Sequence, residues 1–326
     1  MAKEPLVAAL DLGGTNARLA LVSRRGEILA RWVWATASMP DRPNLIATLA
    51  ADLEACREKA RDLDGEVKGM GLGVAGRVLP EEGRVAFSPN IPMLDDCPLT
   101  ALLEPHVSWP LFLENDANLF SLGEHWLGAG VGHPLMLGIT LGTGVGGGLI
   151  LNGRLWSGAA GTGGEIGHLT VDPDGRKCRC GNRGCLETMA SGAWAVAWAK
   201  EELARGAASW LRELYATDPE AISGETLVAA AGQGDPLARR AFARVGSSLG
   251  IAIAGAVHLL GLSRVVIGGR FARAWEVFEP FLQEELYRRL TLFPREALSV
   301  VPAKLGDDAG LIGAARLAWD RASGEQ

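Results

Sequence analysis

Two glycine-rich segments, each with the pattern of strand, turn and strand, constrain the fold of this chain most. The first is LVAALDLGGTNARLALV, residues 6–22, and the second is MLGITLGTGVGGGLILNGRLW, residues 136–156. In both segments, apolar runs of strand length flank a turn that is rich in glycine. A pattern that occurs only twice, at so long a spacing, is not typical of a solenoid. We interpret it as the duplicated start of two related domains.

The rest of the chain alternates between strand and helix patterns. Residues 44–64 carry Ile46, Leu49, Leu53 and Cys56 on one face of a predicted helix. Further strands are predicted at residues 67–76, 110–116, 263–269 and 297–303, and further helices at 117–127, 192–205, 224–232, 236–260, 272–290 and from 309. This alternation predicts an α/β fold in which helices pack on mixed sheets.

The same pattern suggests how the chain divides. We expect a small N-terminal α/β domain over residues 1–117 and a large α/β domain over residues 118–308. The last helix, about residues 309–326, is expected to pack back on the small domain. No linker rich in proline or serine separates the two parts, so we expect them to touch closely.

Composition and charge argue against several classes of protein. The net charge is -6 and the basic runs are only pairs, so nucleic acid is not an expected partner. The apolar run near the N-terminus ends at Asp11 and is too short for the core of a signal peptide. We therefore expect a cytoplasmic location. Residues 125–153 and 245–263 lack charged side chains but contain glycine and histidine, which suits a buried core better than a membrane span.

Three of the five cysteines lie in the segment CRCGNRGCLE, residues 178–187. Thiols stay reduced in the cytoplasm, so a metal explains the cluster better than disulfides do. Cys178, Cys180 and Cys185 would supply three soft ligands to a tetrahedral Zn²⁺, and His168 would supply the fourth. Four protein ligands make a closed, structural site. The alternative is a set of free thiols in a surface loop.

The two glycine-rich turns suit phosphate groups, because successive backbone N–H groups can point at oxygen atoms without obstruction. Asp11, at a strand end beside the first turn, would hold Mg²⁺ through water. A further glycine pair follows the strand VVI in VVIGGR and would let a ribose or base approach. The candidate nucleotide-binding residues are Asp11, Gly13, Gly14, Thr15, Gly142, Thr143, Gly144, Gly268 and Gly269. The alternative for either turn is a plain β-hairpin, since neither has the P-loop or Rossmann pattern.

The order of the motifs DLGGT, GVAG, END, GTGVGGG, EIGH, CRCGNRGCLE and IGG resembles the ROK family. This family contains sugar kinases and sugar-responsive repressors, and its fold is the two-domain actin-like ATPase fold, which is ribonuclease H-like. The segment EIGHLTVDPDGRKCRCGNRGCLE is most similar to bacterial glucokinases. The resemblance implies an enzyme of glycolysis and carbohydrate metabolism that uses ATP and Mg²⁺ to phosphorylate glucose at its 6-hydroxyl.

The resemblance also implies roles for single residues. Asp116 of the END motif corresponds to the catalytic base that accepts the proton of the sugar hydroxyl. The simpler alternative is that Asn115 or Asp116 caps the following helix. The residues implied to bind sugar hydroxyls are Asn90, Asn115, Asp116, Glu165, His168 and Glu187. His168 would serve both the zinc ion and the sugar, one through each ring nitrogen.

Some positions depart from the commoner family pattern. GVAGRV lacks a proline before its second glycine, Arg270 replaces a frequent third glycine, and Leu94 replaces an expected aromatic residue. A kinase for mannose, fructose or an N-acetylated amino sugar therefore stays open. A sugar-responsive repressor would need a helix-turn-helix element ahead of the first strand, where five residues leave no room. A noncatalytic zinc-loop protein would leave Asp11 and both turns without a role.

The expected partners follow from this reading. They are a small-molecule sugar and ATP, with no nucleic acid and no membrane. Because relatives in the family are often dimers or tetramers, the resemblance also implies a homo-oligomer.

Overall fold

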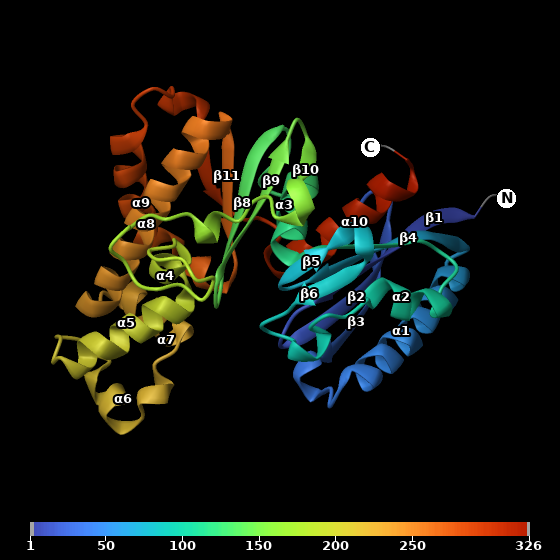
Figure 1. Cartoon of the computed structure of the whole chain (residues 1–326), viewed down its shortest axis with the longest axis horizontal. Coiled ribbons are helices and arrows are strands. Elements are labelled where there is room, and N and C mark those ends of the chain that lie inside the picture. The colour runs from blue at the N-terminus through green and yellow to red at the C-terminus, as the bar shows by residue number, and fades with distance from the viewer. Residues whose placement is uncertain (1–2, 325–326) are drawn as a thin grey trace. The chain divides into compact units, whose positions relative to one another are not determined.

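The computed structural model describes residues 3–324, which form two compact units. Unit 1 contains the chain up to Gly132, the segment Gly148–Gly163 and the chain from Asp307 onward. Unit 2 contains His133–Gly147 and Gly164–Gly306. Figure 1 labels most of the helices and strands of both units.

The first five-stranded sheet lies in unit 1 and has the order β3-β2-β1-β4-β7. Its strands are β1 (Glu4–Leu12), β2 (Asn16–Ser23), β3 (Ile28–Ala35), β4 (Gly65–Val74) and β7 (Leu111–Asn115). β1 pairs with β2 antiparallel and with β4 parallel, so it occupies the centre of the sheet. Residues 6–10 of β1 are buried almost completely, as expected for a strand that is covered on both faces.

The second five-stranded sheet has the order β10-β9-β8-β11-β12. Its strands are β8 (Leu135–Leu141), β9 (Val145–Leu151), β10 (Arg154–Trp156), β11 (Arg264–Gly268) and β12 (Ser299–Pro302). In both sheets the first three strands in chain order lie side by side, and the fourth and fifth follow on the other side of the first. β11 is parallel to β8 and β12, just as β4 is parallel to β1 and β7. The duplication predicted from the two glycine-rich segments is confirmed.

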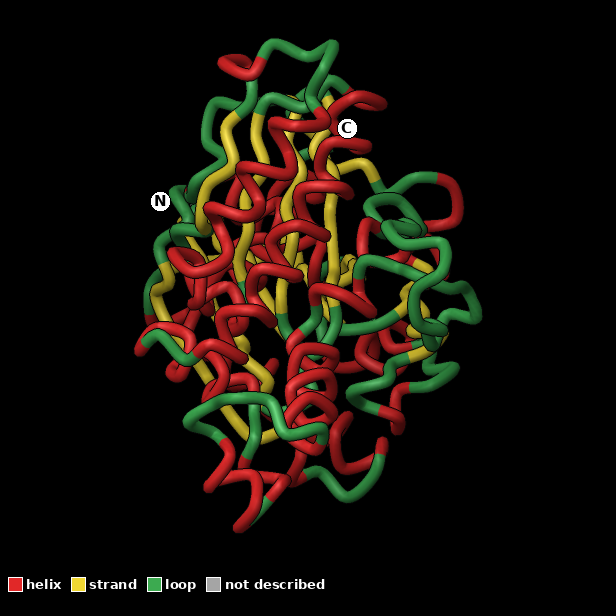
Figure 2. Tube along the Cα trace, turned by 90° about the vertical axis from the view of Figure 1, so that its left-hand side faces the viewer, coloured by secondary structure: helices red, strands yellow, loops and turns green. Residues whose placement is uncertain are grey.

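Figure 2 shows helices and strands side by side in the chain. The structure describes ten α-helices. They are α1 (Arg42–Asp62), α2 (Leu99–Leu103), α3 (Asp116–Leu127), α4 (Glu187–Ala190), α5 (Gly192–Ala204), α6 (Arg212–Thr217), α7 (Gly224–Gln233), α8 (Pro236–Leu260), α9 (Trp275–Arg289) and α10 (Ala309–Ala322). α10 packs against α3, β1 and β4 within unit 1. A side chain at Gly71 of β4 would meet the Ala314 carbonyl oxygen at 2.0 Å, so glycine is needed for this close approach.

α8 is the long apolar helix of unit 2. Asp235 caps its N-terminus by accepting a hydrogen bond from the Ala238 N–H at 2.8 Å, and Gly261 ends it with a φ of 64°. Among the described helices, α8 has the length and composition of a membrane span, but half of its apolar window is buried inside the protein. It packs against α4, α5, α7 and α9, which fits the core role predicted from the sequence.

Other elements differ from the sequence prediction or were not predicted. α1 buries Leu45 together with Leu49, Leu53 and Cys56, while Ile46 is only partly buried. The helix predicted at residues 272–290 begins as a 3-10 turn over Arg270–Ala274, and α9 follows it. The hairpin of β5 (Arg77–Leu79) and β6 (Arg84–Phe87) and the short helices α2 and α6 were missed. Segments of three to six residues are too short to show a periodic pattern.

Candidate active site

The DLGGT turn of unit 1 joins β1 to β2. It is closed by a hydrogen bond from the Gly13 N–H to the Asn16 carbonyl oxygen at 3.1 Å, and Thr15 at its tip is exposed. A Cβ atom at Gly14 would lie 2.8 Å from Cβ of Asn90 and 2.8 Å from its carbonyl oxygen. A residue predicted to bind sugar therefore lies directly against a turn predicted to bind phosphate.

Asp11 stands at the end of β1, opposite Arg18 in the antiparallel register of β1 and β2. Arg18 Nη1 lies 3.4 Å from Asp11 Oδ2, and Arg18 Nη2 lies 3.7 Å from Asp307 Oδ2. Burial raises the pKa of Asp11, Arg18 opposes this effect, and the nearby Asp307 adds to it. A half-buried carboxylate that a single arginine neutralises only in part can accept a cation such as Mg²⁺. Arg18 was not predicted from the sequence, although the hairpin register places it across from Asp11.

Replacing Asp11 with asparagine is expected to raise the Tm at about pH 8 by about 2 °C or more. Because the folded state raises the pKa of Asp11, ionisation of this carboxyl disfavours folding, and asparagine removes that effect. The gain should shrink as the pH falls and should vanish below about pH 3, where the wild-type carboxyl is protonated in both states. Thermal unfolding across this range tests the prediction, with the exposed Asp62→Asn as control. A lower Tm for Asp11→Asn at pH 8 would contradict it.

The END motif ends β7 and begins α3. Asn115 is the N-cap residue, and its Oδ1 accepts hydrogen bonds from the N–H groups of Ala117 at 2.9 Å and Asn118 at 3.3 Å. Its Nδ2 donates to the Gly76 carbonyl oxygen at 2.8 Å. Asp116 is half-buried and is the first residue of α3, and its Oδ1 accepts from the Ala117 N–H at 3.0 Å. Of the two residues considered for the cap, Asn115 takes that position.

The GTGVGGG turn of unit 2 lies against Glu187, the first residue of α4. Glu187 Oε2 accepts a hydrogen bond from the Val145 N–H at 3.0 Å. A Cβ atom at Gly144 would lie 2.4 Å from the same oxygen, so a side chain at this position would displace the Glu187 carboxylate. Thr143 is exposed at the tip of the turn. Unit 2 therefore repeats the arrangement of unit 1, with a predicted sugar-binding residue against a predicted phosphate-binding turn.

Two more glycine segments meet this turn within unit 2. Gly269 has a φ of 93°, and a Cβ atom there would lie 2.3 Å from the Leu141 carbonyl oxygen. Gly192, at the start of α5, donates its N–H to the Gly142 carbonyl oxygen at 2.8 Å. The glycines predicted at 142–144 and 268–269 are thus neighbours in space. Gly192 was missed, because a glycine just after an N-cap serine is ordinary at a helix start.

The Cys₃His cluster forms within unit 2. The ligand atoms of His168, Cys178, Cys180 and Cys185 all lie within 4.8 Å of one another. The sulfur atoms of Cys180 and Cys185 are 3.7 Å apart, and Cys178 Sγ is 3.8 Å from His168 Nδ1. Zinc bonds of about 2.0–2.3 Å at tetrahedral angles give ligand separations of about 3.6–3.8 Å. The four residues therefore fit a zinc ion.

The two ring nitrogens of His168 face different groups. Nδ1 faces the thiol of Cys178, while Nε2 lies 4.0 Å from Oε2 of Glu165. Burial raises the pKa of Cys185 to about 12, and the hydrogen bonds that its thiol donates to Cys180 and Cys178 add to the effect. A metal ion at the centre of the cluster would reverse this effect, because it favours the thiolate. The imidazole can thus ligate a metal through one nitrogen and contact a substrate through the other.

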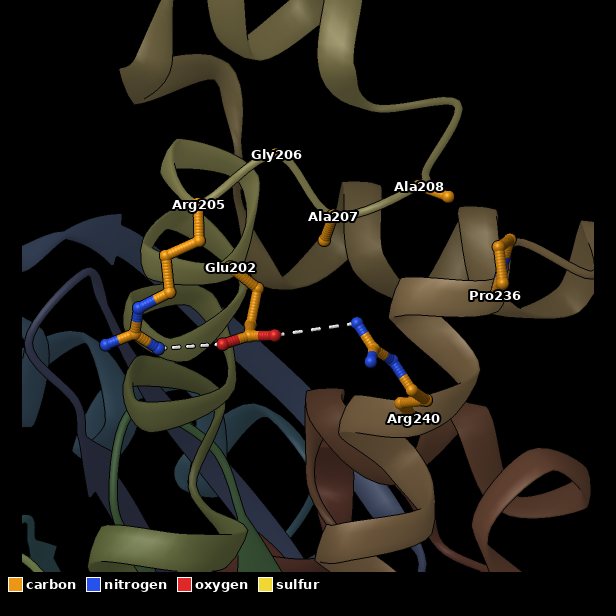
Figure 3. A pocket seen from close by; sticks show the side chains of 7 residues that line it. All are labelled: Glu202, Arg205, Gly206, Ala207, Ala208, Pro236 and Arg240. Atoms are coloured by element: carbon orange, nitrogen blue, oxygen red, sulfur yellow. Dashed lines mark hydrogen bonds and ion pairs between the residues drawn. The ribbon is translucent and has the colours of Figure 1, made fainter.

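A cavity of about 430 Å³ lies elsewhere in unit 2, at the C-terminal end of α5 and the start of α8 (Figure 3). Both arginines that line it pair with its one carboxylate, since Glu202 lies 2.8 Å from Arg205 and 3.6 Å from Arg240. The described residues that line it include none of the predicted site residues. We assign no function to this cavity.

Comparison with known proteins places these features in one family. The sequence profile of the ROK family matches residues 7–321. The chain is 38% identical over 316 residues to a glucokinase of Thermotoga maritima, which covers 97% of this chain and 98% of that protein.

Two solved structures are also similar over nearly the whole chain. A ROK hexokinase from Thermus thermophilus aligns with a TM-score of 0.85 and 33% identity, covering 98% of this chain and 99% of that one. A ROK family glucokinase from Streptomyces griseus, solved with glucose and AMPPNP, aligns with a TM-score of 0.79 and 33% identity, covering 97% and 99%. These are sugar kinases of the actin-like ATPase fold, and the predicted α/β fold class is confirmed. On this evidence, the chain belongs to the ROK family.

Proposed function

We propose that this protein is an ATP-dependent glucokinase that phosphorylates the 6-hydroxyl of glucose. One observation supports this proposal more than any other. In each unit, a residue expected to bind sugar lies directly against a glycine-rich turn expected to bind phosphate, Asn90 against Gly14 and Glu187 against Gly144. Transfer of a phosphoryl group to a sugar needs these two kinds of group at short range. The similarity to glucokinases over nearly the whole chain supports the same reaction.

In the proposed reaction, Asp116 accepts the proton of the 6-hydroxyl. The oxygen forms a bond to the γ-phosphorus of ATP, and the bond from that phosphorus to the bridging β,γ-oxygen breaks. The products are glucose 6-phosphate and ADP. A carboxylate is a weak base. Phosphoryl transfer tolerates a weak base, because its loose transition state depends mainly on alignment and charge neutralisation.

The nucleotide would bind the two glycine-rich turns and the Gly268–Gly269 pair. Thr15 and Thr143 are exposed at the tips of the turns and would donate hydroxyl hydrogen bonds to phosphate oxygens. Asp11 would hold Mg²⁺, which neutralises phosphate charge when it is bound. Zn²⁺ on the Cys₃His cluster would be structural, because four protein ligands leave no open position.

Glucose hydroxyls would bind Asn90, Asn115, Asp116, Glu165, His168 and Glu187. Leu94, the position that departs from the family pattern, is fully buried in the apolar core of unit 1. It therefore gives no specific reason to favour another hexose. A domain boundary near residue 117, assembly into dimers or tetramers, a cytoplasmic location and a place in glycolysis belong to the same proposal.

Initial rates with ATP and a panel of hexoses test the function. The panel contains glucose, mannose, fructose, N-acetylglucosamine and N-acetylmannosamine. We expect kcat/KM for glucose to exceed that for every other sugar by about tenfold or more, because unpaired polar groups in a sugar site penalise the wrong hydroxyl pattern. A faster reaction with another hexose would move the assignment to a kinase for that sugar. Sugar binding without phosphorylation of any hexose would favour a regulator.

A further inference from the structure

Glu114, the first residue of the END motif, is buried beside the proposed catalytic base. Its side chain is 2% exposed. Oε1 accepts hydrogen bonds from the Asn115 N–H at 2.9 Å and from Asn118 Nδ2 at 2.9 Å. Oε2 accepts from the Ser157 hydroxyl at 3.0 Å. All three donors are neutral groups, and all of them belong to unit 1.

The donors of the two hydrogen bonds to Glu114 Oε1 lie on either side of Asp116 in the sequence. One donor is the backbone of residue 115, immediately before Asp116, and the other is the side chain of residue 118, in the first turn of α3. The orientation of Asp116 depends on the backbone between these points. A single buried carboxylate oxygen therefore fixes the chain on both sides of the proposed base.

The other end of the Asn118 amide is left without a hydrogen bond. Asn118 is 2% exposed, and its buried Oδ1 has no hydrogen-bond partner among the described residues. A buried acceptor without a partner is unfavourable. The reverse orientation of the amide would place Oδ1 against the Glu114 carboxylate and leave the first turn of α3 unattached to it.

Ser157 connects this carboxylate to a segment 43 residues away in sequence. The Ser157 carbonyl oxygen accepts the Gly163 N–H at 2.7 Å, so residues 157–163 form a closed loop. Glu165, which we propose to bind sugar, follows this loop by two residues in the chain. The same hydrogen-bond network thus holds the END motif and the loop that precedes Glu165.

We propose that Glu114, fixed by Ser157, is a positioning residue for phosphoryl transfer that holds Asp116 in the orientation needed to accept the sugar proton. This inference rests on the proposed glucokinase function. A misplacement of a reacting group by about 1 Å can lower a rate about 100-fold. The effect of Glu114 should therefore appear in kcat, while the KM for ATP stays close to that of the wild type.

Three variants separate positioning from folding. Glu114→Ala removes all three bonds and is expected to lower kcat about 10- to 100-fold. Glu114→Gln should restore kcat to within about threefold of the wild type, since its Oε1 can accept from both nitrogen donors and its Nε2 can donate to Ser157 Oγ. Ser157→Ala removes one bond and should have a smaller effect. In the Glu114→Ala background it should have none, because the shared bond is already lost.

The decisive measurement compares Glu114→Ala in two backgrounds. If Glu114 acts through Asp116, its loss should lower kcat in the wild type but hardly at all in Asp116→Asn. A purely structural role would lower kcat by the same factor in both. The matched control is Glu124→Ala, which removes a buried carboxylate of α3 that accepts the Ala129 N–H at 2.8 Å. We expect this control to lower the Tm but to keep kcat within about twofold.

Two outcomes would overturn the inference alone. One is a folded Glu114→Ala protein with kcat within about threefold of the wild type, and the other is an equal loss in both backgrounds. If Glu114→Ala fails to fold, the same comparison is made with Ser157→Ala, and equal losses in both backgrounds again reject the inference. A wild-type protein that phosphorylates no hexose would overturn the proposed function and this inference with it.

Discussion

Replacing Asp116 with asparagine is expected to lower kcat for glucose phosphorylation about 100- to 10,000-fold, the range typical for loss of a general base. Asparagine has nearly the size of aspartate but cannot accept the proton. Its Oδ1 can still accept the hydrogen bond that Asp116 takes from the Ala117 N–H at 3.0 Å. Because Asn115 is the N-cap residue of α3, the substitution should leave the start of that helix intact. Steady-state rates in a coupled assay for glucose 6-phosphate test this expectation.

Two measurements separate loss of the base in Asp116→Asn from loss of the fold or of glucose binding. The variant should keep its Tm within a few degrees and should bind glucose with an affinity close to that of the wild type, which calorimetry can measure. Asp62→Asn, an exposed substitution of the same kind at the end of α1, should leave kcat unchanged. Turnover of Asp116→Asn within tenfold of the wild type would reject Asp116 as the base.

Metal analysis of the purified protein is expected to find one tightly bound zinc ion per chain, and Cys185→Ala should lose it. Cys185 is fully buried and contributes one of four ligand atoms that lie within 4.8 Å of one another. The same loop carries His168 at one end and Glu187 at the other. Without the metal these side chains lose their support, so we expect kcat/KM for glucose to fall about tenfold or more.

Cys97→Ala is the matched control for this substitution. Cys97 is also fully buried, but it lies in the apolar core of unit 1, far in sequence from the cluster. Its loss should cost about 1 kcal/mol of stability through the removed packing and should leave the zinc content at one per chain. A protein prepared with excess zinc that holds none, or a Cys185→Ala variant that keeps a full equivalent, would reject the site.

Features that are encoded by neighbouring residues were predicted well from the sequence. α8 runs over the predicted residues 236–260 because its boundaries are local signals, with Asp235 as the N-cap and Gly261 in a left-handed conformation after the last turn. The two glycine-rich hairpins predicted a duplicated domain start, and both sheets show the same strand order. The Cys₃His cluster was also predicted, since three of its ligands lie within eight residues.

Features that depend on which surfaces meet were predicted less well. The face of α1 was assigned to Ile46, whereas packing buries Leu45. Leu45 and Ile46 are both apolar and adjacent, so the apolar pattern alone does not determine which of them faces the sheet. The 3-10 turn at Arg270–Ala274 follows Gly269, whose φ of 93° interrupts the regular backbone before α9 can begin. The residue pattern alone gave no sign of this turn.

The sequence by itself determined the family, the duplicated α/β plan, and the residue types that can bind phosphate, sugar and zinc, because these follow from short motifs and local periodicity. Only the tertiary structure decided which residues of different motifs contact one another. It placed Asn90 against Gly14, Glu187 against Gly144, and Ser157 on Glu114 across 43 residues of chain. Such contacts are made by segments that are distant in sequence, so they exist only once the sheets and helices have packed.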